Sequence, residues 1–438
     1  MDRDTALPRS LWAATAAPAP SYFTAKGDLS AQIVVVGGGY VGLSAALHLA
    51  RGGKSVIVLD GVEPGWGASG RNGGQAIASL KILPDELVQI FGRDKGEHLA
   101  QTMASSTALV YELIEQYKID CQLERKGWIQ AAHGEAALAL LRDRHRQWTQ
   151  RGVAARLLGR DEAANMIGCA PDIYTGAWFD PRGGLLQPLS WARGLARAVI
   201  QEGGLIAARA RVTNVCAEGS RWIVRTSDAT VRCDQVLLAT NAYTDQLWPG
   251  LKQTVVPVTS FQVATAPLPE SILRTVMPGR QGVTDTRRLL HYFRLDHTRR
   301  LVMGGRSPVD DEPDFTDATS LQRAIARTFP QCADIPLDYV WSGRVALTKD
   351  SLPHIHILAN GLYAALGCNG RGVANATMMG KLLAALADGV PAAELALPVT
   401  ALDPFLFYRF RKLGVLAAAT WYRILDQIES RGASDIHA

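Results

Sequence analysis

The stretch AQIVVVGGGYVGLSAALHLARGGKSVIVLD, residues 31–60, decides how the rest of the chain is interpreted. Ile33 to Val36 is a short β-branched run, which predicts a strand buried on both faces. A helix is predicted from about Tyr40 to Arg51, and a second strand covers Ser55 to Leu59. The order strand, glycine turn, helix, strand predicts a βαβ unit.

The glycine turn and the acid after the second strand predict what this unit binds. Gly37, Gly39 and Gly42 have the G-x-G-x-x-G spacing, which permits a tight turn, a close approach of backbone to a pyrophosphate and close helix packing. The helix that begins at Tyr40 directs its positive N-terminus at the phosphates. Asp60 stands where a carboxylate accepts hydrogen bonds from ribose hydroxyls. We therefore predict a dinucleotide site; the alternative is a glycine-rich turn that holds no ligand.

Composition narrows the class of protein. The 438 residues are enough for two or three domains, and a hydrophobic content of 47% with 20% charged residues is ordinary for a globular protein. The net charge of +5 includes no block of lysine and arginine typical of a nucleic-acid patch. The N-terminus does not resemble a signal peptide, and no run of about 18 apolar residues predicts a transmembrane helix.

The six cysteines are scattered without C-x-x-C spacing. This pattern argues against a zinc site and against a redox dithiol, so no metal is predicted. Reduced thiols favour a cytoplasmic location.

A second glycine-rich segment, GWGASGRNGGQ, covers residues 65–75. Ordering so many glycines costs conformational entropy, which is reasonable if the backbone must lie against something flat and polar. Ser69 and Arg71 are predicted to meet phosphate, and Asn72 to Gln75 to run along the edge of a ring. The alternative is a flexible surface loop.

The middle of the chain interrupts the expected sheet. Apolar residues from Leu99 to Tyr117 fall on one face of a long predicted helix, and another helix covers Leu189 to Glu202. Three short strands between 211 and 233 predict a β-meander, followed by a strand over 235–239. The small residues at its end, including Ala239 and Thr240, would let backbone close over a cofactor.

The last part of the chain returns to the pattern of its beginning. Residues 255–265 and a hairpin over 288–304 predict an antiparallel sheet. Leu362 to Asp388 repeats the order strand, glycine loop, helix. The tail from Leu402 to Ser430 predicts an amphipathic helix pair for which core or lid packing is favoured over membrane contact.

This interleaving favours FAD over NAD, because an NAD dehydrogenase would continue with alternating strands and helices. The predicted fold class is α/β, with a Rossmann-like FAD-binding domain that carries a β-meander, interleaved with an α+β substrate domain built on an antiparallel sheet. The predicted parts are an N-terminal arm (1–30), the FAD-binding domain (31–84, 166–250 and 336–392), the substrate domain (85–165 and 251–335) and a C-terminal helical tail (393–438).

Several segments resemble the D-amino-acid-oxidase-like superfamily of FAD enzymes, and most of all its gamma-glutamylputrescine oxidase branch. The resemblance covers about Leu11 to Asp388. Besides the βαβ unit and GWGASGRNGGQ, the segments that carry it are FDPRGGLLQP, LLATNAY, HYFRLDHTRRLVMGGR, WSGRVALTKDSLPHI and GCNGRGVANATMMGKLLA.

The resemblance implies an elongated FAD with its adenosine ribose at Asp60 and backbone from Val212 against adenine. Some family members attach FAD to a cysteine; the equivalent position here falls near Gly343, and Cys368 stands at a different place, so noncovalent FAD is expected. The residues expected to contact FAD are Gly37, Gly39, Tyr40, Gly42, Asp60, Ser69, Arg71, Asn72, Gly73, Gly74, Gln75, Val212, Ala239, Thr240, Gly343, Gly367, Gly370, Arg371, Gly372 and Val373.

The implied reaction is oxidation of the C–N bond of an amine by hydride transfer to flavin N5, after which the imine is hydrolysed. The expected substrate is a polyamine conjugate such as gamma-glutamylputrescine; the alternative is an amino-acid oxidase or dehydrogenase for secondary or D-amino acids. Sarcosine-oxidase-like relatives hold the substrate carboxylate with an arginine and a lysine, which align near Gln75 and Ala374 here. Both basic residues are therefore missing from this chain. Those relatives also have a lysine beside flavin N5 that helps oxygen react, and Val302 aligns with it here. The electron acceptor is therefore either oxygen or another molecule.

Candidate catalytic residues are fewer. Tyr292 and Arg294 share one face of a predicted strand, and His291 and Phe293 share the other, so only one pair can face a substrate. The residues proposed at the reacting end are Arg371, Asn369, Tyr292 and Trp341.

Overall fold

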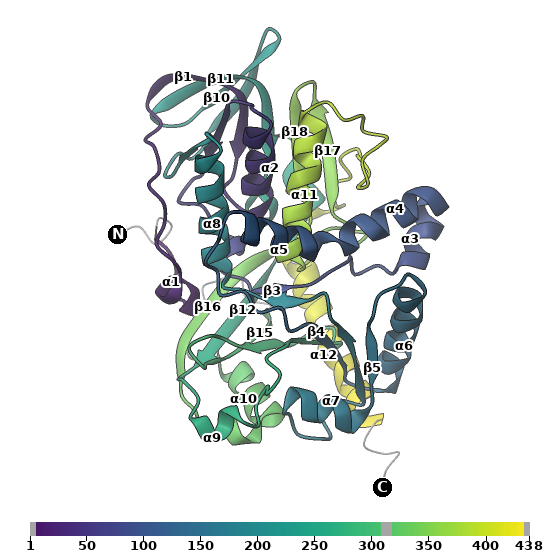
Figure 1. Ribbon diagram of the computed structural model, residues 1–438. Helices are drawn as coiled ribbons and strands as arrows, with labels where there is room; N and C mark the ends of the chain where they lie inside the picture. The colour runs from purple at the N-terminus through teal and green to yellow at the C-terminus, as the bar shows by residue number, and fades with distance from the viewer. Residues whose placement is uncertain (1–5, 308–317, 433–438) are drawn as a thin grey trace.

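The computed structural model describes residues 6–307 and 318–432, which form two large sheets with helices packed around them (Figure 1). The first sheet has the order β17-β18-β11-β1-β2-β8, and β10 and β9 continue from β11 as an antiparallel meander. Its strands are β1 (Gly27–Val36), β2 (Val56–Leu59), β8 (Leu205–Ala207), β9 (Asn214–Glu218), β10 (Arg221–Arg225), β11 (Ala229–Leu238), β17 (His354–Ala359) and β18 (Leu362–Leu366).

The second sheet has the order β16-β12-β15-β14-β13-β4-β6-β5 and is antiparallel except where β13 pairs with β4. A short pair, β3 (Gln75–Ala76) with β7 (Gly184–Leu185), stands apart from both sheets. The strands of the second sheet are β4 (Trp128–Ala132), β5 (Arg156–Leu158), β6 (Gly176–Asp180), β12 (Val256–Thr265), β13 (Gly282–Asp285), β14 (Tyr292–Leu295), β15 (Leu301–Ser307) and β16 (Leu337–Leu347).

Helices cover one face of the first sheet, where α2, α8, α5 and α11 pack against one another (Figure 1). The described helices are α1 (Leu11–Thr15), α2 (Tyr40–Arg51), α3 (Pro84–Phe91), α4 (Arg93–Ala104), α5 (Ser106–Gln116), α6 (Glu135–Gln150), α7 (Arg160–Ile167), α8 (Pro188–Gln201), α9 (Glu270–Leu273), α10 (Thr319–Thr328), α11 (Gly372–Ala387) and α12 (Arg411–Gly432).

Strand β1 is buried on both faces, as its apolar run predicts. Ile33 and Val35 pack in the core under the helices, whereas Val34 and Val36 pack in a second core with the meander. A strand between two such layers needs apolar side chains in both directions. This sandwich fixes the carboxyl ends of β1, β2 and β11 at one edge of the first sheet.

The second sheet has one apolar face, and the part of its other face that borders the cavity carries polar side chains and is called its polar face below. Val263, Phe293 and Met303 pack in a core that includes Leu321 and Ile325 of α10. Because side chains alternate along a strand, the neighbours of these residues point the other way, toward the first sheet.

The predicted fold class is confirmed, with local differences. The third meander strand and the strand predicted over 235–239 are one continuous strand, β11, which pairs with β10 in its first half and with β18 near its end. The long helix predicted across Leu99 to Tyr117 is broken at Ser105, whose hydroxyl donates to the carbonyl of Thr102 at 2.8 Å. A serine side chain that bonds to nearby backbone competes with helical hydrogen bonding.

The predicted domain boundaries assign β6 and β16 to the cofactor domain, whereas both strands belong to the second sheet. Helices α3 to α5 contribute Leu87, Leu99 and Leu109 to the core under the first sheet. The domain boundaries stay a prediction.

The two ends of the chain lie on this body. Trp12 of α1 is fully buried, with its ring centroid 5.9 Å from that of Trp341. The tail forms one long helix, α12, rather than a pair, and Leu413, Leu416 and Trp421 on it are exposed. Within residues 6–307 and 318–432 no helix is both long and apolar enough to cross a membrane.

Candidate active site

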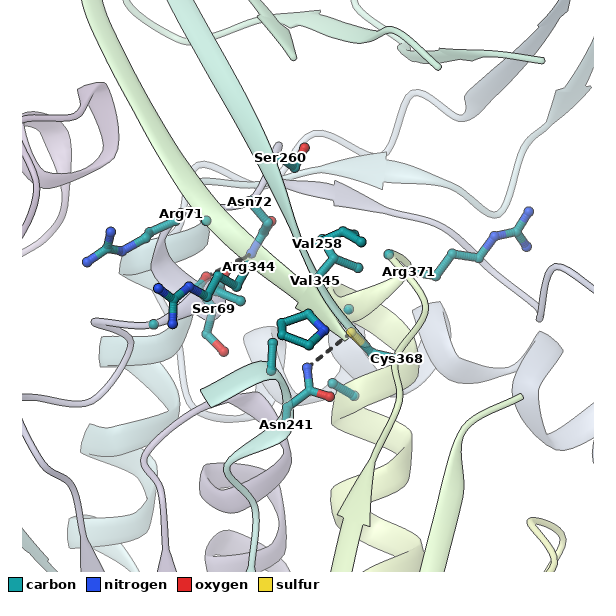
Figure 2. A pocket seen from close by; sticks show the side chains of 18 of the residues that line it. Ser69, Arg71, Asn72, Asn241, Val258, Ser260, Arg344, Val345, Cys368 and Arg371 are labelled. Atoms are coloured by element: carbon teal, nitrogen blue, oxygen red, sulfur yellow. Dashed lines mark hydrogen bonds between the residues drawn. The ribbon is translucent and has the colours of Figure 1, made fainter. Parts of the chain in front are cut away.

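A cavity of about 1750 Å³ is lined by residues of both sheets and of the loops between them. One end lies at the turn between β1 and α2, and the other at the polar face of the second sheet. The glycine-rich loop over 65–75 and the loop before α11 form parts of the wall between those ends (Figure 2).

The turn after β1 is shaped by contacts of its own backbone. Gly37 has a φ of +104°, a backbone conformation that is strained for any residue with a side chain. The N–H of Gly38 donates to Asp60 Oδ2 at 2.7 Å, and that of Val62 to Oδ1 at 2.9 Å. Burial raises the pKa of the Asp60 carboxyl, while both backbone bonds act in the opposite direction.

The loop over 65–75 is ordered by its own side chains. Asn72 Nδ2 donates to the carbonyls of Ser69 and Ala68 at 2.8 and 3.1 Å, and Asn72 Oδ1 accepts from the N–H of Gly74 at 2.8 Å. Ser69 Oγ accepts from the N–H of Tyr40 at 3.0 Å, which ties the loop to the start of α2. The loop is a fixed wall of the cavity and not a flexible linker.

Arg71 is held within this wall. Its Nε donates to the carbonyl of Trp66 at 2.8 Å, and its guanidinium lies 4.4 Å from the centre of the Trp66 ring. The carbonyl of Arg71 accepts hydrogen bonds from the second sheet, from Gln262 Nε2 and from Trp341 Nε1. These bonds join the glycine-rich loop to β12 and β16.

The loop before α11 closes the middle of the cavity. Asn241, just after β11, donates from Nδ2 to Cys368 Sγ at 3.4 Å (Figure 2) and accepts from the N–H of Gly367 at 2.9 Å. Arg371 donates to the carbonyls of Ala78, Ser79 and Leu80, which fixes the segment after β3. Burial lowers the pKa of Arg371 well below its usual value.

The polar face of the second sheet forms the far end. Tyr292 Oη and Ser260 Oγ share a hydrogen bond of 2.9 Å. Gln262 Oε1 and Thr259 Oγ1 are buried without a hydrogen-bond partner in the described part of the chain, and both residues line the cavity.

The structure brings most of the predicted cofactor residues to the lining of one cavity. Sixteen of the predicted residues line the cavity: Gly37, Gly39, Tyr40, Asp60, Ser69, Arg71, Asn72, Gly73, Gln75, Val212, Ala239, Thr240, Gly343, Gly370, Gly372 and Val373. Arg371 and Tyr292, predicted at the reacting end, line it as well.

Five predicted residues do not line the cavity. Gly42 and Gly74 sit where backbone passes backbone: an added Cβ would lie 1.9 Å from the Gly37 carbonyl oxygen and 2.1 Å from that of Leu186. Gly367 has φ of +86° and turns the chain before the loop. Asn369 bonds to Thr348 and to the carbonyl of Gly367, and Trp341 packs against Trp12, so both support the wall from behind.

Sequence reasoning missed several cavity residues. Arg306 follows Val302 and Gly304 on alternate positions of β15, on the face shared with Tyr292, so strand periodicity would have identified it. Lys81 and Thr259 carry no such signal. Lys81 lies in an irregular segment. Thr259 lies in a strand for which we did not predict which side chains point to which face.

The chain is similar to known proteins over most of its length. A family model described as "DAO: FAD dependent oxidoreductase" matches residues 32–386. The chain is 34% identical over 382 residues to gamma-glutamylputrescine oxidoreductase of Escherichia coli (strain K12), covering 87% of this chain and 89% of that protein. It is also 34% identical over 362 residues to the probable oxidoreductase OrdL of Haemophilus influenzae, covering 81% and 82%.

Solved structures show the same fold. Glycine oxidase from Geobacillus kaustophilus superposes with a TM-score of 0.70 at 24% identity, covering 86% of this chain and 97% of that one. L-proline dehydrogenase from P. horikoshii gives 0.70 at 22% identity, covering 88% and 99%.

Proposed function

Because the chain belongs to the DAO family of FAD-dependent oxidoreductases, we propose that it oxidises the C–N bond of a conjugated amine, with gamma-glutamylputrescine as the first candidate. The observation that carries this proposal is the continuous cavity, which joins the turn at Gly37 and Asp60 to the polar face at Tyr292. One end suits a nucleotide, and the other has room for an organic substrate. The name of the Escherichia coli relative supports the choice of amine.

The residues of the cavity fit FAD. Gly37, Gly38 and Gly39 line the nucleotide end without side chains, which leaves room for a pyrophosphate. We propose that Asp60 accepts hydrogen bonds from the ribose hydroxyls and that the N-terminus of α2 binds the pyrophosphate. The chemistry that FAD supplies when bound is two-electron oxidation of the carbon next to the amine nitrogen.

The protein's own part is positioning and electrostatics. We propose that bound FAD and substrate exclude water from the middle of the cavity, which strengthens polar interactions inside it. The N-terminus of α11 borders the cavity through Gly372 and Val373, so its partial positive charge favours negative charge on a group held beside it. We propose that the hydroxyl of Tyr292 orients the amine.

Anaerobic bleaching of the flavin absorbance tests this function. The FAD-loaded protein is mixed with gamma-glutamylputrescine, free polyamines, N-alkyl amino acids and D-amino acids, and the bleaching rate is followed. Fast bleaching by a conjugated amine is expected. Bleaching by amino acids alone would replace the proposal with an amino-acid oxidoreductase, and a protein that takes up no FAD would refute it.

The electron acceptor and the linkage of FAD need separate measurements. Rapid reoxidation by dissolved oxygen would identify an oxidase, and slow reoxidation a dehydrogenase. We propose that FAD is held noncovalently, so acid precipitation should leave the yellow colour in the supernatant. Colour that stays with the protein, and is lost in Cys368→Ala but not in the control Cys216→Ala, would show a covalent link.

A further inference from the structure

Basic side chains crowd the substrate end of the cavity. Among the described lining residues of that end, Asp285 is the one carboxylate, and it is already paired with Arg287 at 2.6 Å. Arg288 is paired with Asp426 of α12 at 3.1 Å. Arg144 donates to Gln130 Oε1 at 2.6 Å. These cations therefore have partners inside the protein.

Lys81 and Arg306 differ from these three arginines. Both line the cavity, and within residues 6–307 and 318–432 neither side chain has a hydrogen bond or an ion pair. Burial and the neighbouring charges of Arg306 and Arg371 lower the pKa of Lys81 to about 7. Burial also lowers the pKa of Arg306. Two basic groups that line one cavity without an anion have their charged forms disfavoured, and a bound anion would stabilise those forms.

The position of this pair relates it to the reacting end. Arg306 lies on β15 beside Tyr292, which pairs with Gly304 of the same strand. Lys81 follows the segment whose carbonyls are fixed by Arg371. The pair is thus held from two sides, by the second sheet and by the loop before α11.

We propose that Lys81 and Arg306 bind a carboxylate that the substrate carries at a distance from the amine to be oxidised. This inference rests on the proposed function and narrows its substrate class to carboxylated amines. An arginine and a lysine offer a planar pair of donors and a point charge, which together suit a carboxylate. The same cations repel plain polyamines, whose second ammonium would meet them, and they favour the neutral form of the reacting amine.

Binding of an unreactive carboxylate tests the pair without turnover. Pentanoate is titrated into the FAD-loaded protein, with calorimetry and the visible spectrum of the flavin as readouts, and pentan-1-ol serves as the uncharged probe. Pentanoate should bind, and Lys81→Met and Arg306→Met should each weaken it about tenfold or more. Lys26→Met and Arg323→Met remove matched charges at exposed positions and should leave the affinity unchanged.

Conservative variants keep the test informative if a methionine variant folds poorly. Lys81→Arg and Arg306→Lys retain the charge and should retain most of the pentanoate affinity. Equal affinity for pentanoate in the wild type and in both methionine variants would overturn the proposal. So would an altered flavin spectrum of ligand-free Lys81→Met with unchanged pentanoate affinity, because the cations would then serve the cofactor.

Three amines of equal length separate this inference from the function on which it rests. 5-Aminopentanoate should bleach the flavin at lower concentration than 1-aminopentane, and 1,5-diaminopentane should be poorest. The order should collapse in Lys81→Met/Arg306→Met. If no amine bleaches the flavin, the proposed oxidation is refuted. Pentanoate binding then still tests whether Lys81 and Arg306 bind a carboxylate. If all three bleach equally in the wild type, the carboxylate site is refuted.

Discussion

Removing the hydroxyl of Tyr292 is a mild change at the reacting end, because the aromatic ring stays in place. Its ring fills the space above Gly304, where an added Cβ would lie 2.2 Å from ring Cζ. Burial raises its pKa to about 12, so the hydroxyl stays protonated at neutral pH. Tyr292→Phe should lower kcat/KM for the best amine about three- to tenfold, the value of one hydrogen bond, with FAD content unchanged.

Ser260→Ala is the matched control for this variant, because it removes the partner of Tyr292 Oη and leaves the phenol in place. A smaller loss is expected. If Tyr292→Phe turns over at the wild-type rate, the hydroxyl has no part in orienting the amine.

The charge of Lys81 predicts a pH dependence of anion binding. The groups that face Lys81 are Arg306 from β15 and Arg371 and Cys368 from the loop before α11. Pentanoate is ionised above pH 6, and Lys81 loses its proton as the pH rises through its depressed pKa of about 7. Affinity should therefore fall as the pH rises from 7 to 9, with a midpoint shifted upward because bound carboxylate favours the ammonium form.

Calorimetric titration at a series of pH values measures this fall. Lys81→Met should give a weaker and nearly flat profile. A profile in Lys81→Met as steep as that of the wild type would assign the titration to another group.

At the residue scale the sequence was most informative where chemistry demands one residue type. The spacing of Gly37 and Gly39, and the acid at Asp60, could be interpreted without a structure because a pyrophosphate and a ribose limit what can stand there. Asn369 and Trp341 were named from their place in a resembling segment, which does not say which way a side chain points. Lys81 could not be identified, since the charged groups near it, Arg306 and Arg371, come from segments far away in the chain.

At the scale of the elements, the close contact between α2 and α11 predicts how a substitution in it changes stability. An added Cβ on Gly380 of α11 would lie 2.4 Å from the carbonyl oxygen of Val41, so the two helices touch by their backbones. Gly380→Ala should lower the free energy of unfolding by about 1–3 kcal/mol through overpacking. Denaturant unfolding of the FAD-loaded protein measures the change.

Gly414→Ala in α12 is the matched control, because that glycine is also helical but has open space around it. Helix propensity alone favours alanine by up to about 1 kcal/mol, so this variant should be neutral or more stable. Opposite signs for the two variants are expected, and a stabilised Gly380→Ala would show that the helices are further apart.

Sequence periodicity predicted the elements well where one face meets a core. The strand at Ile33 to Val36 and the strand Leu362–Leu366 were found because both lie in a buried parallel sheet. Periodicity could not show that β11 is continuous, since its register with β10 and β18 depends on pairing across the chain. It also missed the break at Ser105, where the side-chain hydroxyl donates to the carbonyl of Thr102.

At the scale of the whole molecule, the cavity walls come from both sheets, and this predicts strong coupling between FAD binding and stability. A ligand that binds only the folded state stabilises it by RT ln(1 + [L]/Kd), about 2.7 kcal/mol at one hundred times Kd. Scanning calorimetry of protein stripped of FAD should therefore show a Tm that rises with added FAD. AMP, which could fill only the nucleotide end, should raise it less; an unchanged Tm with FAD would contradict the fit.

The interleaving of the two sheets could be predicted only in outline. Alternating helical and strand-like segments indicated two interwoven parts, but whether β6 and β16 join one sheet or the other depends on long-range pairing, such as that of β16 with β12. Such pairing leaves no local pattern in the sequence.

The parallel pairing of β11 with β18 also has a consequence for biosynthesis. β11 ends at Leu238, whereas its neighbour begins only at Leu362, so the ribosome releases the first strand long before the second exists. Until then the growing polypeptide presents an open, apolar sheet edge, the kind of surface that recruits other chains. Chaperone occupancy of nascent chains should accordingly be greatest between these two points and should fall once β18 has emerged.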